Sequence, residues 1–399
     1  MPKPPLHRLW RPPSLQSEHP EAPVKETWLE LFYDLVYVAV FIQLGDRLSN
    51  DVSWRGVWRF AVIFVPVWWA WSNFAFYMNR FVVDDLWHRL IVAFQVFCVA
   101  WMGLSVAEAL GAQSTQFVLL YITFRVTLVV LYLRTLKPLP ATRALAIRYI
   151  TDYHLVAITL WGASLFLEPL ERWVLWIVAF LWELLNSQRS LFRRFHLEHP
   201  LNGEHLRERF GTLTLLVLGE SFIKSITSER SLGLTPEVLL VSLPGIFLLF
   251  SLWWLYFEDA DGAYDNKETT NPTLWLYTHL PLSMALVSFG VATKKLLTSV
   301  YEGRLGAEYA LLYCASLTVY CLALVIINLW GKKVARRQRA FVRFAAALAM
   351  GGVFLLWGGR EAVWFTSAAC AIFLLQVIHD LYLARRYPEA DPEVGELTA

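Results

Sequence analysis

The chain has 399 residues, of which 57% are hydrophobic and 15% aromatic, whereas only 17% are charged. Soluble domains contain roughly 45–50% apolar and about 25% charged residues, so this composition excludes an ordinary soluble protein. The formal net charge of +2 argues against a nucleic-acid-binding protein, because such proteins concentrate basic residues on one face. We therefore expect a membrane protein whose first partner is the lipid bilayer and which binds no nucleic acid.

The first 27 residues are rich in proline and contain no apolar stretch, which predicts a disordered cytosolic tail rather than a signal peptide. Apolar runs of about 20 residues then follow one another, and each can cross roughly 30 Å of hydrocarbon. Because these runs are continuous, they favour helices over the alternating strands of a β-barrel. The sequence thus predicts an all-α polytopic membrane protein with about twelve transmembrane helices.

The predicted spans form two groups of six. The first six are 28–48, 57–78, 87–109, 115–134, 148–167 and 171–187. The second six are 206–227, 237–257, 273–293, 307–330, 340–358 and 362–383. The expected domains are a tail (1–27), a first six-helix half (28–187), a cytosolic linker (188–205), a second six-helix half (206–385) and a cytosolic tail (386–399).

Lysine and arginine are concentrated in alternate connections between the spans. With the N-terminus in the cytoplasm, the connections on that side carry 23 of these residues and the opposite side carries 10. Cytoplasmic connections are the more basic ones in membrane proteins. We therefore expect a multi-pass protein of the cytoplasmic (inner) membrane with both termini in the cytoplasm.

Three short patterns recur in the same order in the two groups of spans. The matching pairs begin at Glu30 and Glu208, at Trp68 and Trp253, and at Leu119 and Leu311. An even number of spans per copy would give two parallel six-helix repeats, as in some transporters. Chance alignment of leucine- and tryptophan-rich segments is the alternative.

A few ionisable residues fall inside the predicted spans, where a charge costs roughly 2.5–3.5 kcal/mol on insertion scales. Glu30 and Asp34 are four residues apart and share one face of the first helix, so they would repel each other without a cation or a shared proton between them. One interpretation is a proton or cation site. The other is that both carboxylates bond a neighbouring arginine and fix helix packing.

The seventh span carries a carboxylate deep in its apolar run. Glu220 stands between Gly219 and Ser221, which are small enough to let helices approach closely. Arg209 lies on the same helix face about three turns earlier, so the two charged residues would line one polar pathway.

The fourth span carries Arg125, which requires a counter-ion. Asp34 and Glu220 are the suppliers that the sequence suggests. The alternative is a buried ion pair that locks helices together.

Motifs for nucleotide binding, serine hydrolysis and zinc proteolysis are absent from the sequence, so we expect no enzyme, no cofactor and no metal site. A membrane-embedded enzyme would require His279 or His379 to meet carboxylates at one depth. After the eighth span, the pattern Asp259-x-Asp261 does not fit a calcium-binding loop, because its glycine comes too early and Thr270 stands where a glutamate is required. This acidic connection predicts a solvated turn that pairs with the basic stretch 332–343.

Two specific motifs resemble the bacterial low temperature requirement protein A family. They are Thr27–Val36 and Glu208–Gly211, the latter continuing to Val217–Ser221. Looser matches occur at Tyr256-Phe257 and at His279–Leu282, and the resemblance covers about residues 25–385. The family name describes a requirement for growth in the cold, which is a phenotype and not a reaction. The resemblance marks as signature positions Glu30, Asp34, Glu208, Arg209 and Glu220.

These observations lead to a functional hypothesis. The residues expected to form an ion or substrate pathway are Glu30, Asp34, Arg125, Glu208, Arg209 and Glu220. They suggest a secondary transporter or an ion- or proton-coupled permease for a small solute or ion. The alternative is a membrane-state sensor or lipid-interacting structural protein that supports growth in the cold, indicated by 19 tryptophans, which favour the membrane interface. The sequence does not determine the oligomeric state.

Overall fold

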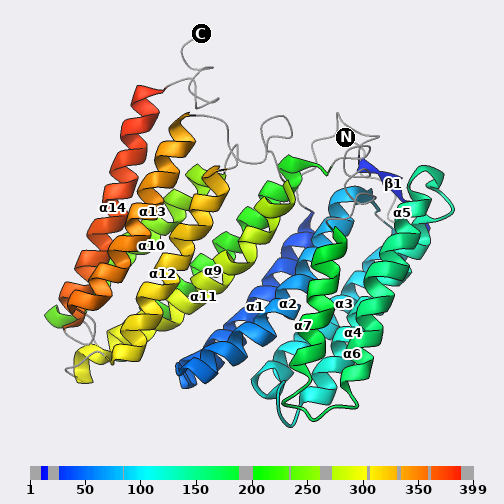
Figure 1. Ribbon diagram of the computed structural model, residues 1–399, viewed down its shortest axis with the longest axis horizontal. Coiled ribbons are helices and arrows are strands. Elements are labelled where there is room, and N and C mark those ends of the chain that lie inside the picture. Colours follow the sequence, from blue (N-terminus) through cyan, green and yellow to red (C-terminus); the bar gives the residue numbers. More distant parts are fainter. Residues whose placement is uncertain are drawn as a thin grey trace. The chain divides into compact units, whose positions relative to one another are not determined.

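The computed structural model is almost entirely helical (Figure 1). It describes residues 10–16, 27–83, 85–187, 201–232, 235–260, 272–302, 306–329, 334–357 and 361–387. Most of the predicted linker (188–200) and of the C-terminal tail (388–399) therefore lies outside the described residues. Each of the twelve predicted spans coincides with a helical element.

The first six spans correspond to the elements from α1 to α7. Their bounds are α1 (Trp28–Asn50), α2 (Trp54–Arg80), α3 (Leu86–Ser105), α4 (Ser114–Thr135), α5 (Arg143–Arg148), α6 (Val156–Ser164) and α7 (Trp173–Ser187). A π-helical segment, Tyr149–Leu155, joins α5 to α6 without a break. The fifth predicted span is therefore a single helical rod with a local widening.

The last six spans correspond to the elements from α9 to α14. Their bounds are α9 (Gly203–Leu232), α10 (Pro236–Ala260), α11 (Pro272–Glu302), α12 (Ala307–Leu329), α13 (Val334–Trp357) and α14 (Ala362–Arg386). Among the described residues of the chain, nine helices are long and apolar enough to cross a membrane, and α7 is a shorter apolar helix. The prediction of a helical protein with multiple membrane spans is confirmed.

The chain forms two compact units whose boundaries fall inside helices. Unit 1 comprises Met1–Leu44 and Trp58–Arg209, and unit 2 comprises Gly45–Val57 and Phe210–Ala399. The sequence instead predicts a boundary in the linker 188–205. Because the divisions lie within α1, α2 and α9, each of these three helices contributes residues to both units.

The helices of each unit pack in chain order. In unit 1, α3 packs against α4, α4 against α6, and α6 against α7. In unit 2, α11 packs against α12, α12 against α13, and α13 against α14, which also contacts α10. The last helix of each unit also contacts an early one, since Trp69 of α2 donates to Glu183 of α7 and α10 contacts α14.

Several tryptophans occupy the core of unit 1 rather than the membrane interface. Trp68, Trp71 and Trp161 are at most 2% exposed, whereas Trp28 and Trp54 at the helix ends are more than 85% exposed. A buried indole contributes a large apolar area, but its N–H group needs an acceptor. The buried indole N–H groups of unit 1 therefore require hydrogen-bond acceptors inside the core.

Part of the predicted disordered tail has an ordered place against unit 1. Strand β1 (Ser14–Leu15) pairs antiparallel with β2 (Phe81–Val82), which directly follows α2. The backbone N–H of Arg11 donates to Asp85 Oδ2 over 2.8 Å, and the Arg134 guanidinium lies 4.5 Å from the Trp10 ring centroid. Residues 10–16 thus cover one end of the unit.

Asp85 holds this segment in place. Its side chain caps α3 by accepting the N–H of His88 over 2.7 Å, and it accepts a second bond from Arg134 Nη2 over 2.6 Å. Burial opposes ionisation of Asp85, but the N–H groups of Arg11 and His88 and the Arg134 guanidinium outweigh it, so its pKa is lower than the usual 3.8.

Substitution of Asp85 tests this attachment. Asp85→Asn keeps a capping side chain but loses the charge, which should weaken the contact by about 1.5 kcal/mol. We expect faster hydrogen exchange at the Arg11 amide at neutral pH. Equal exchange in the variant and the wild type would contradict this role.

The same amide should also respond to pH in the wild type. A carboxylate whose pKa is lowered by folding stabilises the folded state fully above the unfolded-state pKa, and this stabilisation disappears as the pH falls through the lower folded-state pKa. Protection of Arg11 should therefore decrease below about pH 4. The Asp85→Asn protein, which lacks the titrating group, serves as the control.

Candidate functional site

The first signature carboxylate caps its own helix. The backbone N–H of Thr27 donates to Glu30 Oε2 over 2.8 Å, and the Thr27 hydroxyl donates to the same oxygen over 2.9 Å. In return, the Glu30 N–H donates to Thr27 Oγ1 over 3.3 Å. This reciprocal arrangement is a capping box, which satisfies donors at a helix start. The Thr27–Glu30 spacing therefore has a structural purpose.

The other oxygen of Glu30 faces the beginning of α9. His205 Nε2 lies 3.4 Å from Glu30 Oε1, and both side chains are at most 3% exposed. Asn79 orients this imidazole: its Nδ2 lies 3.3 Å from His205 Nδ1, and it exchanges two further bonds with the backbone of Asn202. A donor from α9 therefore meets the first carboxylate.

Asp34 forms the second contact between α1 and α9. Arg209 Nη2 lies 2.8 Å from Asp34 Oδ1, and Trp71 Nε1 donates to the same oxygen over 2.7 Å. The side chains of Asp34 and Arg209 are both 0% exposed. Glu30 and Asp34 thus do not share one cation between them, because each has its own partner on α9. This geometry corresponds to the helix-packing interpretation.

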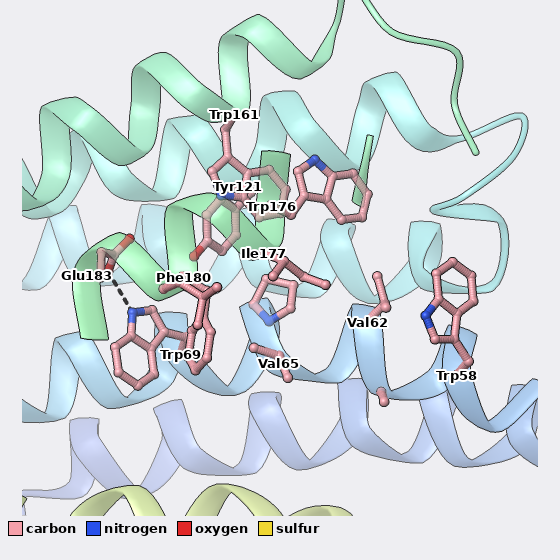
Figure 2. A pocket seen from close by; sticks show the side chains of 13 residues that line it. Trp58, Val62, Val65, Trp69, Tyr121, Trp161, Trp176, Ile177, Phe180 and Glu183 are labelled. Carbon is pink, nitrogen blue, oxygen red and sulfur yellow. Dashed lines mark hydrogen bonds between the residues drawn. The ribbon is translucent and has the colours of Figure 1, made fainter. Parts of the chain in front are cut away.

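Arg125 has a different counter-ion from the two that the sequence suggests. Its Nη2 lies 2.8 Å from Glu183 Oε1 on α7, and both of its terminal nitrogens donate to Oε2 over 3.0 Å. Trp69 Nε1 donates to the same Oε2 over 2.6 Å (Figure 2). The expected pairing with Asp34 or Glu220 is wrong, because Asp34 pairs with Arg209 and Glu183 meets the guanidinium as a bidentate partner.

The π-helical segment also takes part in this cluster. His154, which lies in that segment, places Nδ1 3.3 Å from Arg125 Nη1. Tyr121 accepts a bond from Arg125 Nη2 over 2.6 Å. Side chains from α4, α7 and the rod between α5 and α6 thus converge on one buried guanidinium.

Glu220 belongs to a more accessible cluster in unit 2. Lys224 Nζ lies 3.7 Å from Glu220 Oε1 and 3.4 Å from Asp46 Oδ1. The side chains of Asp46, Glu220 and Lys224 are 50%, 21% and 12% exposed. Two carboxylates thus flank one ammonium group, and all three side chains are partly exposed.

Small residues create the space for this cluster. A Cβ atom on Gly45 would lie 3.3 Å from Lys224 Nζ, and a Cβ atom on Gly290 would lie 2.6 Å from Ser221 Oγ. The lack of a side chain at Gly290 therefore lets α11 approach Ser221 of α9 closely. Gly219 differs, because nothing lies within 4 Å of its Cβ position.

A comparison of the sequence with models of protein families identifies the family to which these helices belong. The family model described as bacterial low temperature requirement A protein (LtrA) matches residues 25–378, which is nearly the whole chain. The chain belongs to the LtrA family. An uncharacterised protein of Rhizobium meliloti (strain 1021) is 29% identical over 294 residues, which cover 70% of this chain and 71% of that protein.

The structure separates the signature positions of this LtrA protein by their surroundings. Glu30, Asp34 and Arg209 lie in the dry contacts between α1 and α9, and Glu220 lies in the accessible cluster. Glu208 is half-buried and takes part in neither group. The sequence groups these residues correctly by helix but does not separate dry from accessible positions.

A third buried cluster lies in unit 2, and the sequence predicts only part of it. Arg343 of α13 lies 2.9 Å from Asp259 Oδ2 on α10 and 2.5 Å from Asp380 Oδ2 on α14. All three side chains are at most 1% exposed. The expected pairing of the acidic residues after the eighth span with the basic stretch is confirmed for Asp259, but its expected solvation is wrong.

Neighbouring arginines reinforce the same junction. Arg336 donates to the backbone carbonyl of Asp259 and Arg339 to that of Glu258, the two residues before the last residue of α10. Arg339 also pairs with the Glu258 carboxylate. Cationic donors at a helix C-terminus satisfy carbonyls that have no partner within the helix. The spacing of Arg336, Arg339 and Arg343 on one helix face is the signal that could have revealed this cluster.

The two histidines of the enzyme alternative have different surroundings. His279 lies among aromatic rings, with Nε2 3.1 Å from the Tyr256 hydroxyl. His379 Nδ1 lies 3.8 Å from Asp380, whose carboxylate is already paired with Arg343. In the described part of the chain, no group of three or more His, Cys, Asp or Glu residues could hold a metal ion.

A double-mutant cycle measures the Asp34–Arg209 pair. Asp34→Asn or Arg209→Gln alone should cost about 3–5 kcal/mol, because each leaves an uncompensated buried charge. The double variant should cost about 1–3 kcal/mol less than the sum of the two. Thermal unfolding in detergent provides the measurement, with Glu208→Gln as a nearly neutral control. Additive single effects would contradict a direct pair.

A matched pair of substitutions on α13 tests the third cluster. Arg343→Leu leaves two buried carboxylates facing each other and should destabilise unit 2 by about 3–5 kcal/mol. Arg337→Leu makes the same chemical change at an exposed position and should shift stability by less than about 0.5 kcal/mol. Similar thermal midpoints for the two variants would exclude a structural role for the cluster.

Proposed function

We propose that the chain is an ion- or proton-coupled secondary transporter of the cytoplasmic membrane for a small solute or ion. The observation that carries this proposal is the cluster of Asp46, Glu220 and Lys224. Two carboxylates share one ammonium group there, so a proton or a cation can neutralise the excess negative charge. Ionisable residues retained inside a membrane segment often mark ion pathways.

The contrast with the other clusters assigns separate roles to the charges. Asp34–Arg209 and Arg125–Glu183 are ion pairs of opposite charge with side chains at most 1% exposed, so they have neither water access nor excess charge. We assign these two pairs to helix packing. Glu220 remains the candidate coupling residue, and the proposal includes no catalytic residue.

Contacts between α1 and α9 support the proposed membrane topology of twelve spans with both termini in the cytoplasm. Along α1, Glu30, Asp34 and Asp46 meet residues of α9 in ascending order, namely His205, Arg209 and Lys224. The two helices therefore run in the same direction. Six crossings in the first half would return the chain to the side on which it started.

Parallel features of the two units support the proposed duplication. The third helix of each predicted half packs against the fourth, and the fifth against the sixth. The last helix of each half carries a buried carboxylate, Glu183 or Asp380, that pairs with an arginine. We propose that the halves are two parallel six-helix repeats, an arrangement known in transporters.

Reconstitution tests the transport proposal. Pyranine-filled proteoliposomes are mixed with pools of amino acids, sugars, organic acids and inorganic cations under an imposed pH or sodium gradient. At least one pool should change the internal pH or accumulate. Glu220→Gln should reduce gradient-driven uptake roughly 10²-fold, as the loss of a proton-transferring group typically does.

Glu208→Gln is the matched control on the same helix and should leave uptake unchanged. If no pool responds to either gradient, the transport proposal fails. A second candidate then takes precedence: a membrane-embedded structural or sensor protein that supports growth in the cold. Its support is that the signature pair Asp34–Arg209 is dry and fully buried.

A further inference from the structure

Unit 1 contains an elongated cavity that the proposed transport pathway does not use. Its volume is about 320 Å³, and it lies between α2, α4, α6 and α7 (Figure 2). This is about twice the size of an apolar cavity of 150 Å³ that holds benzene, and it falls within the range of small-molecule sites. Its walls are formed mainly by Trp58, Val65, Trp69, Tyr121, Trp161 and Trp176.

The cavity follows one face of α2. Trp58, Val62, Val65 and Trp69 recur at helical spacing, so the lined face extends about 16 Å along the helix axis. Trp58 lies at one end of the group and Trp69 with Glu183 at the other (Figure 2). A long, narrow shape of this kind accommodates a flexible chain better than a compact ring system.

The polar side chains at one end of the cavity bond each other, so they do not favour a polar ligand. Glu183 is the only carboxylate among its lining residues, and Arg125 and Trp69 already occupy both of its oxygens with four hydrogen bonds. A cationic ligand would also have to approach the Arg125 guanidinium. An apolar cavity forfeits dispersion contacts unless an apolar group fills it, so the lining favours a hydrocarbon chain.

The rim opens toward the lipid-facing side of α7. Ile177 and Leu181 are 36% and 45% exposed, and both line the cavity. A hydrocarbon chain can therefore enter the cavity from the side of α7 that faces the lipid.

We propose that this cavity binds one acyl chain of a membrane phospholipid. The aromatic walls exclude water from the chain, and the exposed rim on α7 lets the chain enter from the surrounding lipid. This proposal does not depend on transport activity. It assigns to unit 1 a lipid site whose occupancy would follow the composition of the surrounding membrane.

Photocrosslinking tests the cavity. The purified full-length protein is reconstituted in nanodiscs that contain phosphatidylglycerol with a diazirine in its acyl chain, and labelled peptides are identified by mass spectrometry. We expect enriched labelling of the α2 and α7 segments that line the cavity. Val65→Trp should reduce this labelling about tenfold, the change that results when about two methylene groups lose their burial.

Val178→Trp makes the same change on the lipid-facing side of α7, outside the cavity, and should leave the labelling unchanged. Ala61→Phe provides a second cavity-filling variant if Val65→Trp does not fold. Equal labelling in a folded cavity-filling variant and in Val178→Trp would overturn the proposal.

Two further arms identify the ligand. Diazirine-labelled phosphatidylcholine should label the cavity as strongly as the phosphatidylglycerol probe, because the cavity holds the acyl chain and not the headgroup. Competition by free fatty acid as effective as by phosphatidylglycerol would overturn the phospholipid assignment.

Discussion

The cost of an unpaired charge in hydrocarbon is the constraint on which this structure depends. The three most deeply buried arginines meet carboxylates on other helices: Arg125 meets Glu183, Arg209 meets Asp34, and Arg343 meets Asp259 and Asp380. Because removal of either partner would leave the other charge buried, these pairs fix which helices are neighbours and how each is rotated. Segments far apart in the chain are thereby held in register.

Buried tryptophans are subject to a similar constraint, because their indole N–H groups also need partners inside the core. Trp69 and Trp71 are two residues apart on α2, and their indole N–H groups donate to Glu183 and to Asp34 respectively. One helix therefore connects two separate ion pairs through its aromatic side chains. The high tryptophan content, which suggests interfacial anchoring, serves in large part to build a dry core and the walls of a cavity.

Exposure distinguishes the charged clusters where charge alone does not. The pairs in the core of unit 1 are balanced and dry, which suits a rigid scaffold. The cluster of Asp46, Glu220 and Lys224 has more carboxylates than ammonium groups and remains accessible. A protein that moves ions needs both kinds of site, because a titrating group works only when the surrounding helices keep their positions.

The sequence by itself determined the membrane class, the helical positions and the family. Hydropathy is a local property, so runs such as those of α1 and α4 are recognised without any partner, and the signature from Thr27 to Val36 identifies the family as directly. The capping of α1 by Glu30 also follows from local spacing.

Only the tertiary structure decided the partners of the buried charges. The sequence suggests Asp34 or Glu220 as the counter-ion of Arg125. Its actual counter-ion is Glu183, because the rotation of α4 and α7 about their axes brings these two side chains together. From its position at the end of a span, Asp259 is expected to be solvated, but it is buried in an ion pair with Arg343. Ion pairing depends on distance and orientation between helices, and a single sequence encodes these only through the packing of the whole unit.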